Sequence, residues 1–363
     1  MKHMPQYLSP VSIIPGGVLQ FLDLALSLES AAKLRRYFRE EQRPAGDPSG
    51  LYSHFLRCLE PEGDGFVDQL SGQAAEYDYD VDARKALDVW QEHWLPVPFL
   101  RTRDQKWPDG RDRFEYGPSN WARCRITRRQ GPDGGDMLRL VLIFDTQVED
   151  PPQEGEHYHA LAQRDLAAHA TFKLAAHVRD NSWFLNASWV DQWIHGIYSA
   201  YRQGKHKGRG SWNEDNPHVL EHLASYLTLL DIVGLALRDL AVQVINPDRD
   251  LPVEVDLILD IGNSRTTGIL VETLPQRITN LNDSYLLHIR DLSRPEHLYT
   301  DPFETRVEFA EASFGNDALS RRSGRRTPAF AWPSAVRIGP EASRIATQAV
   351  CAEGATGMSS PKR

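Results

Sequence analysis

The sequence predicts a mixed α/β protein with two domains, an α+β domain over residues 1–250 and a second domain with a mixed sheet over residues 251–363. Its 363 residues are enough for two domains of ~150 residues each. Short apolar runs typical of β-strands occur along the chain together with segments of helical spacing. A long helical pattern stops at Asn246-Pro247, and we place the boundary between the two domains there, at about residue 250.

The composition is that of a soluble globular protein, with 41% hydrophobic and 25% charged residues. A formal net charge of −9 gives no support for nucleic-acid binding, which favours a basic face. The apolar stretch Val11–Leu26 is interrupted by Pro15 and Asp23, so it falls short of the ~20 apolar residues that span a membrane. We therefore expect a cytoplasmic protein with no membrane span.

Cysteine usage indicates a reducing compartment. Cys58, Cys124 and Cys351 lie far apart and form no CxxC pair. An odd and sparse set of cysteines argues against a disulfide framework and against a structural zinc site.

The first domain is expected to begin with a strand–turn–strand unit, in which Ser12–Ile14 and Val18–Leu24 flank the turn Pro15-Gly16-Gly17. Apolar residues from Leu28 to Phe38 recur mostly every three or four positions, which predicts a helix that begins at Ser27. Further elements are predicted by the same patterns: helices over 50–59 and 82–93, paired strands over 122–128 and 137–146, a strand over 168–178, a helix that ends near 201, and a long helix from Asn216-Pro217 to Asn246.

Two motifs resemble metal sites, and both have a simpler interpretation. Carboxylates alternate over Glu76–Asp82 as in a calcium loop, but Ala83 and Val89 stand where that template requires glycine and glutamate. A solvated strand edge or loop is therefore favoured. His157 and His159 could bind a metal, but no further ligand lies nearby in the sequence. We interpret them as solvent-exposed.

Two segments could bind an anionic or nucleic-acid partner. Tryptophans interleaved with arginines can stack nucleobases, and four of them lie at Trp90, Trp94, Trp107 and Trp121. Because the chain is acidic, we interpret these tryptophans as core and interface residues. The loop Arg202–Gly210 is the most basic segment of the chain and could grip an anion. A flexible connector with solvated charges is the favoured interpretation.

The most informative stretch is Val253–Thr273, VEVDLILDIGNSRTTGILVET. Two apolar runs bracket a turn from Ile261 to Thr267, and this arrangement predicts a β-hairpin. An ordinary hairpin would close with a shorter Asn-Gly or Asp-Gly turn. A turn this rich in small polar residues is instead suited to hold a phosphate.

Each residue of this turn has an expected role in a phosphate cradle. Gly262 allows close approach of the backbone, and successive N–H groups form an anion-binding nest. Asp260, at the end of the first strand, is suited to hold a hydrated Mg²⁺ beside the phosphates. The remaining candidates supply N–H groups or hydroxyls, namely Asn263, Ser264, Thr266 and Thr267. Arg265 could contact a phosphate or point to solvent.

The motif Asp-Ile-Gly-Asn-Ser-x-Thr-Thr resembles the first phosphate motif of the actin, sugar-kinase and chaperone ATPase superfamily. The whole chain resembles the N-terminal part of the SrfB family, annotated in bacteria as virulence factors. The family resemblance includes the opening stretch Val11–Asp23 and the long helix before residue 253. It implies that residues 251–363 begin an actin-like, ribonuclease H-like ATPase domain and that the protein is bacterial.

The C-terminal residues carry further points of resemblance. Strands are predicted over 284–290, 327–330 and 334–338, followed by a helix over 342–351. A Thr-Pro strand, an Ile-Gly turn and an alanine-rich helix follow one another here, and this order is similar to that in one subdomain of the chaperone ATPases. In those ATPases a lysine of the same subdomain assists phosphoryl transfer. The similarity implies that Lys362 is the catalytic counterpart, whereas the arginine-rich turn Arg321–Arg326 is interpreted as a solvated tip.

The resemblance implies ATP and Mg²⁺ as ligands of the full-length family. About 110 residues follow Leu251 without a second Asp/Gly-rich phosphate loop, so we expect a truncated chain that is not catalytically competent alone. The alternative is a non-enzymatic scaffold, in which the tryptophan-rich N-terminal domain docks protein partners from the same operon. A sugar kinase is a weaker third possibility, because no sugar-binding signature is visible.

Overall fold

The computed structural model describes residues 11–16, 19–44, 52–103, 106–110, 113–117, 120–148, 161–205, 218–237, 240–246, 254–273, 284–300, 302–316 and 330–351. Over these residues the protein is mixed α/β, as predicted, with more strands than helices. The chain divides into two compact units. Unit 1 comprises Met1–Gly16 and Gln20–Val244, and unit 2 comprises Gly17–Leu19 and Ile245–Arg363.

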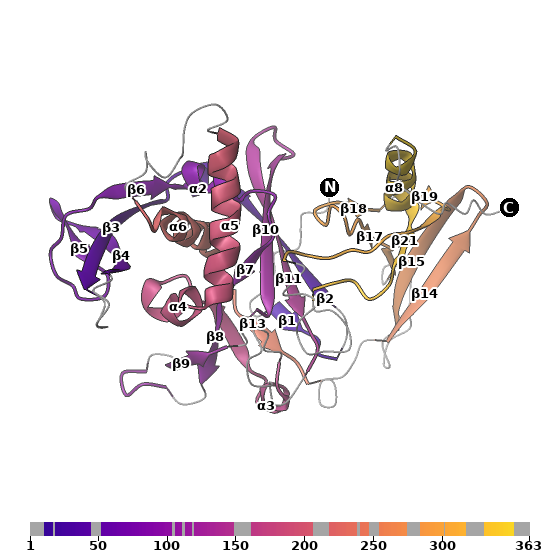
Figure 1. Cartoon of the computed structure of the whole chain (residues 1–363). Helices are drawn as coiled ribbons and strands as arrows, with labels where there is room; N and C mark the ends of the chain where they lie inside the picture. The colour runs from indigo at the N-terminus through magenta and orange to yellow at the C-terminus, as the bar shows by residue number, and fades with distance from the viewer. Residues whose placement is uncertain are drawn as a thin grey trace. The chain divides into compact units, whose positions relative to one another are not determined.

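The described residues of unit 1 form three sheets, visible in Figure 1. The first has the order β1-β13-β12-β8-β9, with β1 (Val11–Ile13), β13 (Val242–Val244), β12 (Thr171–Leu174), β8 (Phe99–Arg103) and β9 (Arg113–Tyr116). In this sheet β1 pairs parallel with β13, and the other neighbours pair antiparallel. The sheet therefore joins the first and last described strands of unit 1.

The second sheet has the order β2-β11-β10-β7, with β2 (Leu19–Ser27), β11 (Asp136–Asp145), β10 (Ala122–Gln130) and β7 (Leu95–Val97). Its centre is the long antiparallel hairpin β10–β11, in register from Ala122 opposite Phe144 to Gln130 opposite Asp136. This hairpin confirms the strand pair predicted from the apolar runs. The strands β1 and β2, predicted around the Pro-Gly-Gly turn, are both present but belong to different sheets.

The third sheet has the order β5-β4-β3-β6, with β5 (Gly65–Asp68), β4 (Tyr52–Glu62), β3 (Arg35–Pro44) and β6 (Tyr79–Asp82). It corrects two predicted helices. The helical pattern that begins at Ser27 forms only the short helix α1 (Leu28–Ala31), and the segment predicted as a helix over 50–59 is strand β4 where it is described. The cause is tertiary: β3 pairs with β4 on one side and β6 on the other, which outweighs local helical spacing.

An aromatic cluster joins the first two sheets. Phe99 and Phe172 come from the first sheet, Phe144 comes from β11, and Trp121 directly precedes β10. The ring centroid of Trp121 lies 5.6 Å from that of Phe99, 4.9 Å from that of Phe144 and 4.8 Å from that of Phe172. All four side chains are at most 1% exposed. The indole Nε1 of Trp121 donates to the Asp145 carbonyl at 2.8 Å, so its one polar group is also satisfied.

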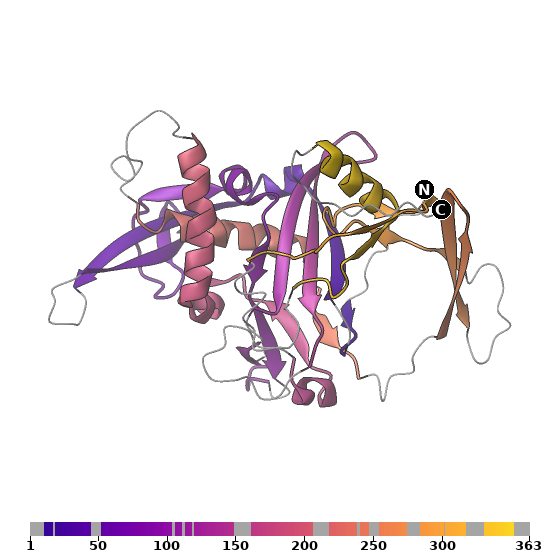
Figure 2. The same cartoon turned by 45° about the vertical axis from the view of Figure 1, so that its right-hand side comes forward.

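Helices form the other part of the unit 1 core. They are α2 (Ala83–Trp90), α3 (Gln163–Ala167), α4 (Val178–Leu185), α5 (Ser188–Lys205) and α6 (Glu221–Ala236). Helix α6 contacts α2, α5, β6 and β3, and it is apolar on nearly all sides, as expected of a central helix. The Trp90 indole donates to Ser225 Oγ at 2.9 Å between α2 and α6. Figure 2 shows the β3–β4 hairpin extending away from these helices.

The helical predictions hold for α2, α5 and α6, with one correction of length. Asp82 caps α2, where its side chain accepts from the Lys85 N–H at 2.8 Å. The long helix predicted to reach Asn246 ends at Ala236 instead, and β13 occupies Val242–Val244. Since β13 pairs with β1 and β12, sheet pairing again decides the end of the segment.

The described residues of unit 2 form antiparallel strands and the helix α8. Its elements are β14 (Glu254–Ile261), β15 (Arg265–Thr273), β16 (Ser284–Leu286), β17 (Ile289–Arg290), β18 (Leu298–Tyr299), β19 (Phe303–Glu304), β20 (Val307–Phe309), β21 (Val336–Ile338) and α8 (Gly339–Cys351). One sheet has the order β14-β15-β16, with β19 also paired to β15. The segment 334–338, predicted to continue that sheet, instead pairs with β20, and α8 contacts β19, β20 and β21.

Two buried carboxylates hold the middle of unit 2 together. Asp291 is fully buried. Its two carboxylate oxygens lie 2.8 and 2.9 Å from Arg344 Nη2, which donates to them, and one of them also accepts from the Tyr299 hydroxyl at 3.1 Å. Glu341 accepts the Leu292 N–H at 3.1 Å and the Ser293 hydroxyl at 2.6 Å. Since donors surround both carboxylates, this cluster is a structural network. Sequence reasoning did not predict it.

Among the residues that the structure describes, no helix combines the length and the apolar character needed to span a membrane.

Candidate functional site

The predicted phosphate cradle lies at the tip of hairpin β14–β15. Asp260 stands opposite Thr267 and Ile261 stands opposite Thr266, so both strands run almost to the tip. The turn is therefore the three residues Gly262, Asn263 and Ser264, shorter than the predicted seven-residue turn. The structure thus brings the predicted residues 260–267 together around one tight turn.

Backbone geometry makes Gly262 a requirement of this turn. Its N–H donates to the Arg265 carbonyl at 2.9 Å, and a Cβ added at this position would lie 2.8 Å from the same oxygen. A side chain at residue 262 would therefore push the turn open. Because the Gly262 N–H is already used inside the turn, it is not available as the predicted phosphate donor.

Thr305 anchors the turn, and sequence reasoning missed it. Its hydroxyl lies 2.8 Å from the Gly262 carbonyl and 2.7 Å from the Thr266 hydroxyl, and its N–H donates to the Ser264 carbonyl at 3.1 Å. Thr266 is 8% exposed, and its hydroxyl contact with Thr305 helps to hold the turn. No sequence signal pointed to Thr305, because it lies far along the chain in the segment after β19.

Several polar groups at the tip remain available for a ligand. Within the described residues, the Asp260 carboxylate makes no hydrogen bond or ion pair, and the N–H groups of Asn263 and Ser264 have no acceptor. Asp260, Asn263 and Ser264 are all exposed. Arg265, whose role the sequence left open, donates to the Pro302 carbonyl at 3.2 Å. The tip can thus offer one carboxylate, two N–H donors and the Ser264 hydroxyl.

A metal at this tip would be held by Asp260 and by groups outside the protein. The described residues contain no cluster of three His, Cys, Asp or Glu side chains placed to hold a metal. One carboxylate fits Mg²⁺, which prefers one or two protein carboxylates together with phosphate oxygens and water. Lys362, the predicted catalytic lysine, lies outside the described residues, as do His157 and His159.

Strand β14 also presents an apolar surface. Its residues Val255, Leu257, Ile258, Leu259 and Ile261 are between 44% and 59% exposed. In the described residues β14 pairs with β15 alone, so its other edge is open. Three carboxylates, Glu254, Asp256 and Asp260, lie on one face of the strand, and Ile258 separates the last two.

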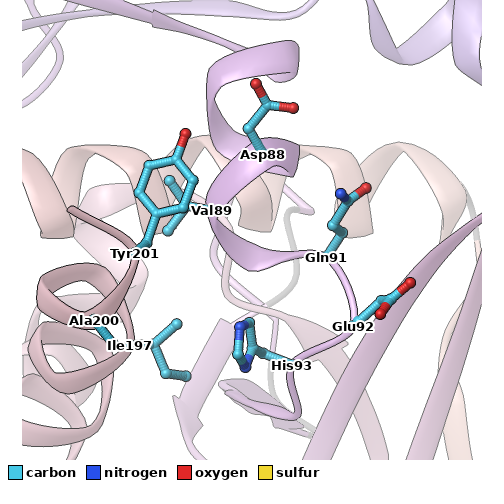
Figure 3. A pocket seen from close by; sticks show the side chains of 8 residues that line it. All are labelled: Asp88, Val89, Gln91, Glu92, His93, Ile197, Ala200 and Tyr201. Atoms are coloured by element: carbon cyan, nitrogen blue, oxygen red, sulfur yellow. The ribbon is translucent and has the colours of Figure 1, made fainter. Parts of the chain in front are cut away.

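A first pocket in unit 1 lies between α2 and α5 and has a volume of about 410 Å³ (Figure 3). Val89, Ile197 and Ala200 give it an apolar side, and its polar residues are Asp88, Gln91, Glu92, His93 and Tyr201. Burial lowers the pKa of His93, so its imidazole is neutral at pH 7. Asp88 is paired with Arg128 at 3.3 Å. This pocket offers mixed chemistry without a dominant charge.

The two cysteines whose side chains are described are inert. Cys58 and Cys124 are both free thiols at 2% exposure. Burial raises the pKa of Cys58 to about 12 and raises that of Cys124 as well. Since the thiolate is the reactive form, neither cysteine is a nucleophile at neutral pH.

The tryptophans predicted to be core residues divide into two groups. Trp90 and Trp121 are at most 1% exposed and belong to the core. Trp107 is 51% exposed, and the guanidinium of Arg113 lies 4.5 Å from its ring centroid. Of the basic loop Arg202–Gly210, only the part up to Lys205 is described, and the Lys205 ammonium lies 4.6 Å from the Tyr201 ring centroid.

Comparison with known proteins gives one family match. A family model described as "Virulence factor SrfB" matches residues 1–363. No curated protein and no solved structure matches the chain.

Proposed function

The chain belongs to the SrfB family of virulence factors, and on that premise we propose that the tip of hairpin β14–β15 binds the phosphates of ATP together with Mg²⁺. In this proposal the N–H groups of Asn263 and Ser264 donate to phosphate oxygens, and the Asp260 carboxylate holds the hydrated ion. The bound Mg²⁺ would neutralise phosphate charge. The hairpin would thereby be the first phosphate loop of an actin-like domain.

One observation carries this proposal: among the described residues, the three-residue turn leaves the N–H groups of Asn263 and Ser264 and the adjacent Asp260 carboxylate without a partner. The turn is fixed from both sides by the Gly262–Arg265 hydrogen bond and by Thr305. N–H groups that are held in place before the ligand arrives bind anions with little loss of entropy. The Asp260 carboxylate stands beside them, unpaired among the described residues.

Calorimetric titration of the whole chain with ATP, with and without Mg²⁺, tests the proposal. We expect Asp260→Asn to weaken Mg²⁺-dependent ATP binding at least about tenfold, equivalent to ~1.4 kcal/mol. Asp256→Asn is the matched control, because Asp256 lies on the same strand and is also exposed, and from the described residues it accepts only the Thr273 hydroxyl, at 3.2 Å. Equal ATP affinity in the two variants, or no binding by the unmodified chain, would contradict the assignment.

The exposed apolar surface of β14 favours a second function, the docking of a partner protein. An open strand edge with apolar side chains on both faces is suited to pair with an added strand. Because Glu254, Asp256 and Asp260 share one face with Ile258, the complementary strand would carry basic residues on that face, with an apolar residue opposite Ile258. A protein encoded in the same operon is the partner we propose.

Site-specific photo-crosslinking in cells tests this docking function. Benzoylphenylalanine replaces Ile258 in one variant and Tyr116 in the control, since both positions are more than half exposed. An adduct with one different protein at position 258 only, confirmed by mass spectrometry and by binding of the purified partner, supports docking. An adduct with a second copy of this chain, or identical adducts at both positions, would contradict it.

A further inference from the structure

A second pocket in unit 1 lies between the first sheet and helix α3, with a volume of about 480 Å³. Polar residues dominate its lining, which contrasts with the mixed pocket between α2 and α5. Its walls come from β8, β9, α3 and the start of β12, and the residues that line it include Arg101, Thr102, Arg103, Glu115, Arg164 and His169.

A buried ion-pair network forms the base of this pocket. Arg101 is 9% exposed and binds Asp165 through two nitrogens, at 2.5 and 3.0 Å. It also donates to Glu115 at 3.1 Å, and its guanidinium lies 5.5 Å from the Phe172 ring centroid. The second carboxylate oxygen of Glu115 accepts from Arg103 Nε at 3.1 Å. Burial favours a higher pKa for Glu115, but the hydrogen bonds from Arg101 and Arg103 lower it, so the carboxylate stays charged.

This network uses every carboxylate that lines the pocket. Arg101 and Arg103 balance the charges of Asp165 and Glu115. Arg164 adds a further positive charge, and among the described residues its exposed guanidinium has no ion-pair partner. The pocket therefore carries a positive charge on a chain whose net charge is −9. Within the described chain, a cation has no free carboxylate to bind here, whereas an anion meets the unpaired guanidinium of Arg164 and the exposed side chain of Arg103.

Two buried polar atoms of the lining residues have no partner in the described part of the chain. They are Thr102 Oγ1 and His169 Nε2. Buried polar atoms are nearly always hydrogen-bonded, and an unsatisfied one at a cavity often marks the place of a bound ligand or water. His169 Nε2 can donate to an oxyanion, and no lining carboxylate is left to accept from it. Thr102 lies between Arg101 and Arg103 on β8, so its side chain points to the other face of the sheet.

His169 ends helix α3 in a left-handed backbone conformation, with a φ of 49°. Its N–H donates to the Leu166 carbonyl at 3.3 Å, and the Ala170 N–H donates to the Asp165 carbonyl at 2.8 Å, which is the Schellman motif that ends many helices. Glycine is the usual residue at this position because it has no Cβ. A glycine here would adopt this φ more easily but would remove the imidazole from the pocket.

From these observations we propose that this pocket binds a small organic anion whose phosphate or carboxylate group is held by Arg103 and Arg164. Guanidinium groups form paired hydrogen bonds to both oxyanions. His169 supplies a further donor to the same ligand. The Arg101–Asp165 pair holds β8 and α3 together and so positions the binding residues.

Calorimetry on the whole chain, at constant ionic strength, tests this proposal with inorganic phosphate and with citrate as probes. We expect at least one probe to bind, and Arg164→Gln to weaken that binding about tenfold or more. Arg84→Gln is the matched control, because Arg84 is also exposed on a helix of unit 1 but does not line the pocket. Binding of phosphate alone identifies a phosphate ester as the ligand class, and binding of citrate alone identifies a carboxylate.

A second variant separates binding from folding. His169→Gly should raise the melting temperature, because glycine adopts the positive φ of this position without a Cβ clash. The same variant should weaken binding of the probe. Asp260→Asn should leave this binding unchanged, because Asp260 belongs to the hairpin of unit 2. The proposal is overturned if neither probe binds, or if Arg164→Gln and Arg84→Gln bind the probe equally well.

Discussion

Strands β11 and β14 have similar apolar sequences and opposite environments. In β11, six consecutive residues from Leu140 to Asp145 are buried. In β14, all eight residues from Glu254 to Ile261 are exposed. The difference lies in the neighbours: β11 pairs on both sides and packs against an aromatic cluster, while β14 pairs on one side only within the described part of the chain. An apolar run thus predicts a strand, but partners decide whether the strand is buried.

The largest effect is expected for Leu142→Ala in β11. Leu142 is fully buried, so the substitution removes apolar contacts and leaves a cavity. We expect a loss of about 2–5 kcal/mol in the free energy of unfolding of unit 1. Chemical denaturation monitored by tryptophan fluorescence measures this loss, because the chain has nine tryptophans and most of the described ones belong to unit 1. A loss below about 1 kcal/mol would mean that β11 is not a core strand.

A smaller effect is expected from acidification, and it should be confined to unit 1. Burial lowers the pKa of His222 although Asp191 Oδ1 lies 2.9 Å from its Nε2 and acts in the opposite direction. In the unfolded chain the His222 imidazole therefore takes up a proton near pH ~6.5, whereas in the folded protein it does so only at lower pH. Stability should be unaffected above about pH 7.5 and should fall as the pH drops through ~6.5 toward the lower folded pKa.

Comparison of the unmodified chain with His222→Gln, at about pH 7.5 and about pH 5.5, checks this sign. Glutamine does not titrate in this range, so the variant should lose less stability on acidification. His93, whose pKa burial also lowers, contributes in the same direction, and His93→Gln serves as a second variant. An unchanged pH dependence in both variants would show that other groups control the acid response.

The smallest effect is expected for Leu257→Ala in β14, the counterpart of Leu142→Ala. Leu257 is 52% exposed, so truncation removes little buried surface. The free energy of unfolding should change by no more than about 0.5 kcal/mol, measured by the same denaturation assay. A loss similar to that of Leu142→Ala would show that β14 is covered in solution, and the contrast between the two strands would disappear.

The sequence predicted elements whose partners are close along the chain. The hairpins β10–β11 and β14–β15 and the capped helix α2 follow from local patterns of apolar residues, turns and caps. It failed at β3 and β4, where apolar residues at helical spacing form strands because β6 and β5 complete their sheet. Such strand pairing depends on contacts between residues distant in sequence, and the spacing of apolar residues along one segment does not predict these contacts.

The candidate sites follow the same division. Residues 260–267 form one continuous motif, so their meeting at one turn was predictable from the sequence. Thr305, which anchors that turn, was not predictable, because its contact with Gly262 is tertiary. The pocket proposed to bind an anion combines residues of β8, β9, α3 and β12. The only local sequence pattern that points to it is the alternation Arg101-Thr102-Arg103 on one strand.

The parallel pairing of β1 with β13 has a consequence for how the protein is made. Val11–Ile13 leaves the ribosome early, but its partner Val242–Val244 is synthesised last in unit 1. Nascent chains generally fold a domain once it has emerged, so the first sheet of unit 1 must wait for nearly the whole unit to be translated. Until then β1 remains without its sheet partner, and a ribosomal pause before Val242 would lengthen the time that a chaperone has to bind the incomplete sheet.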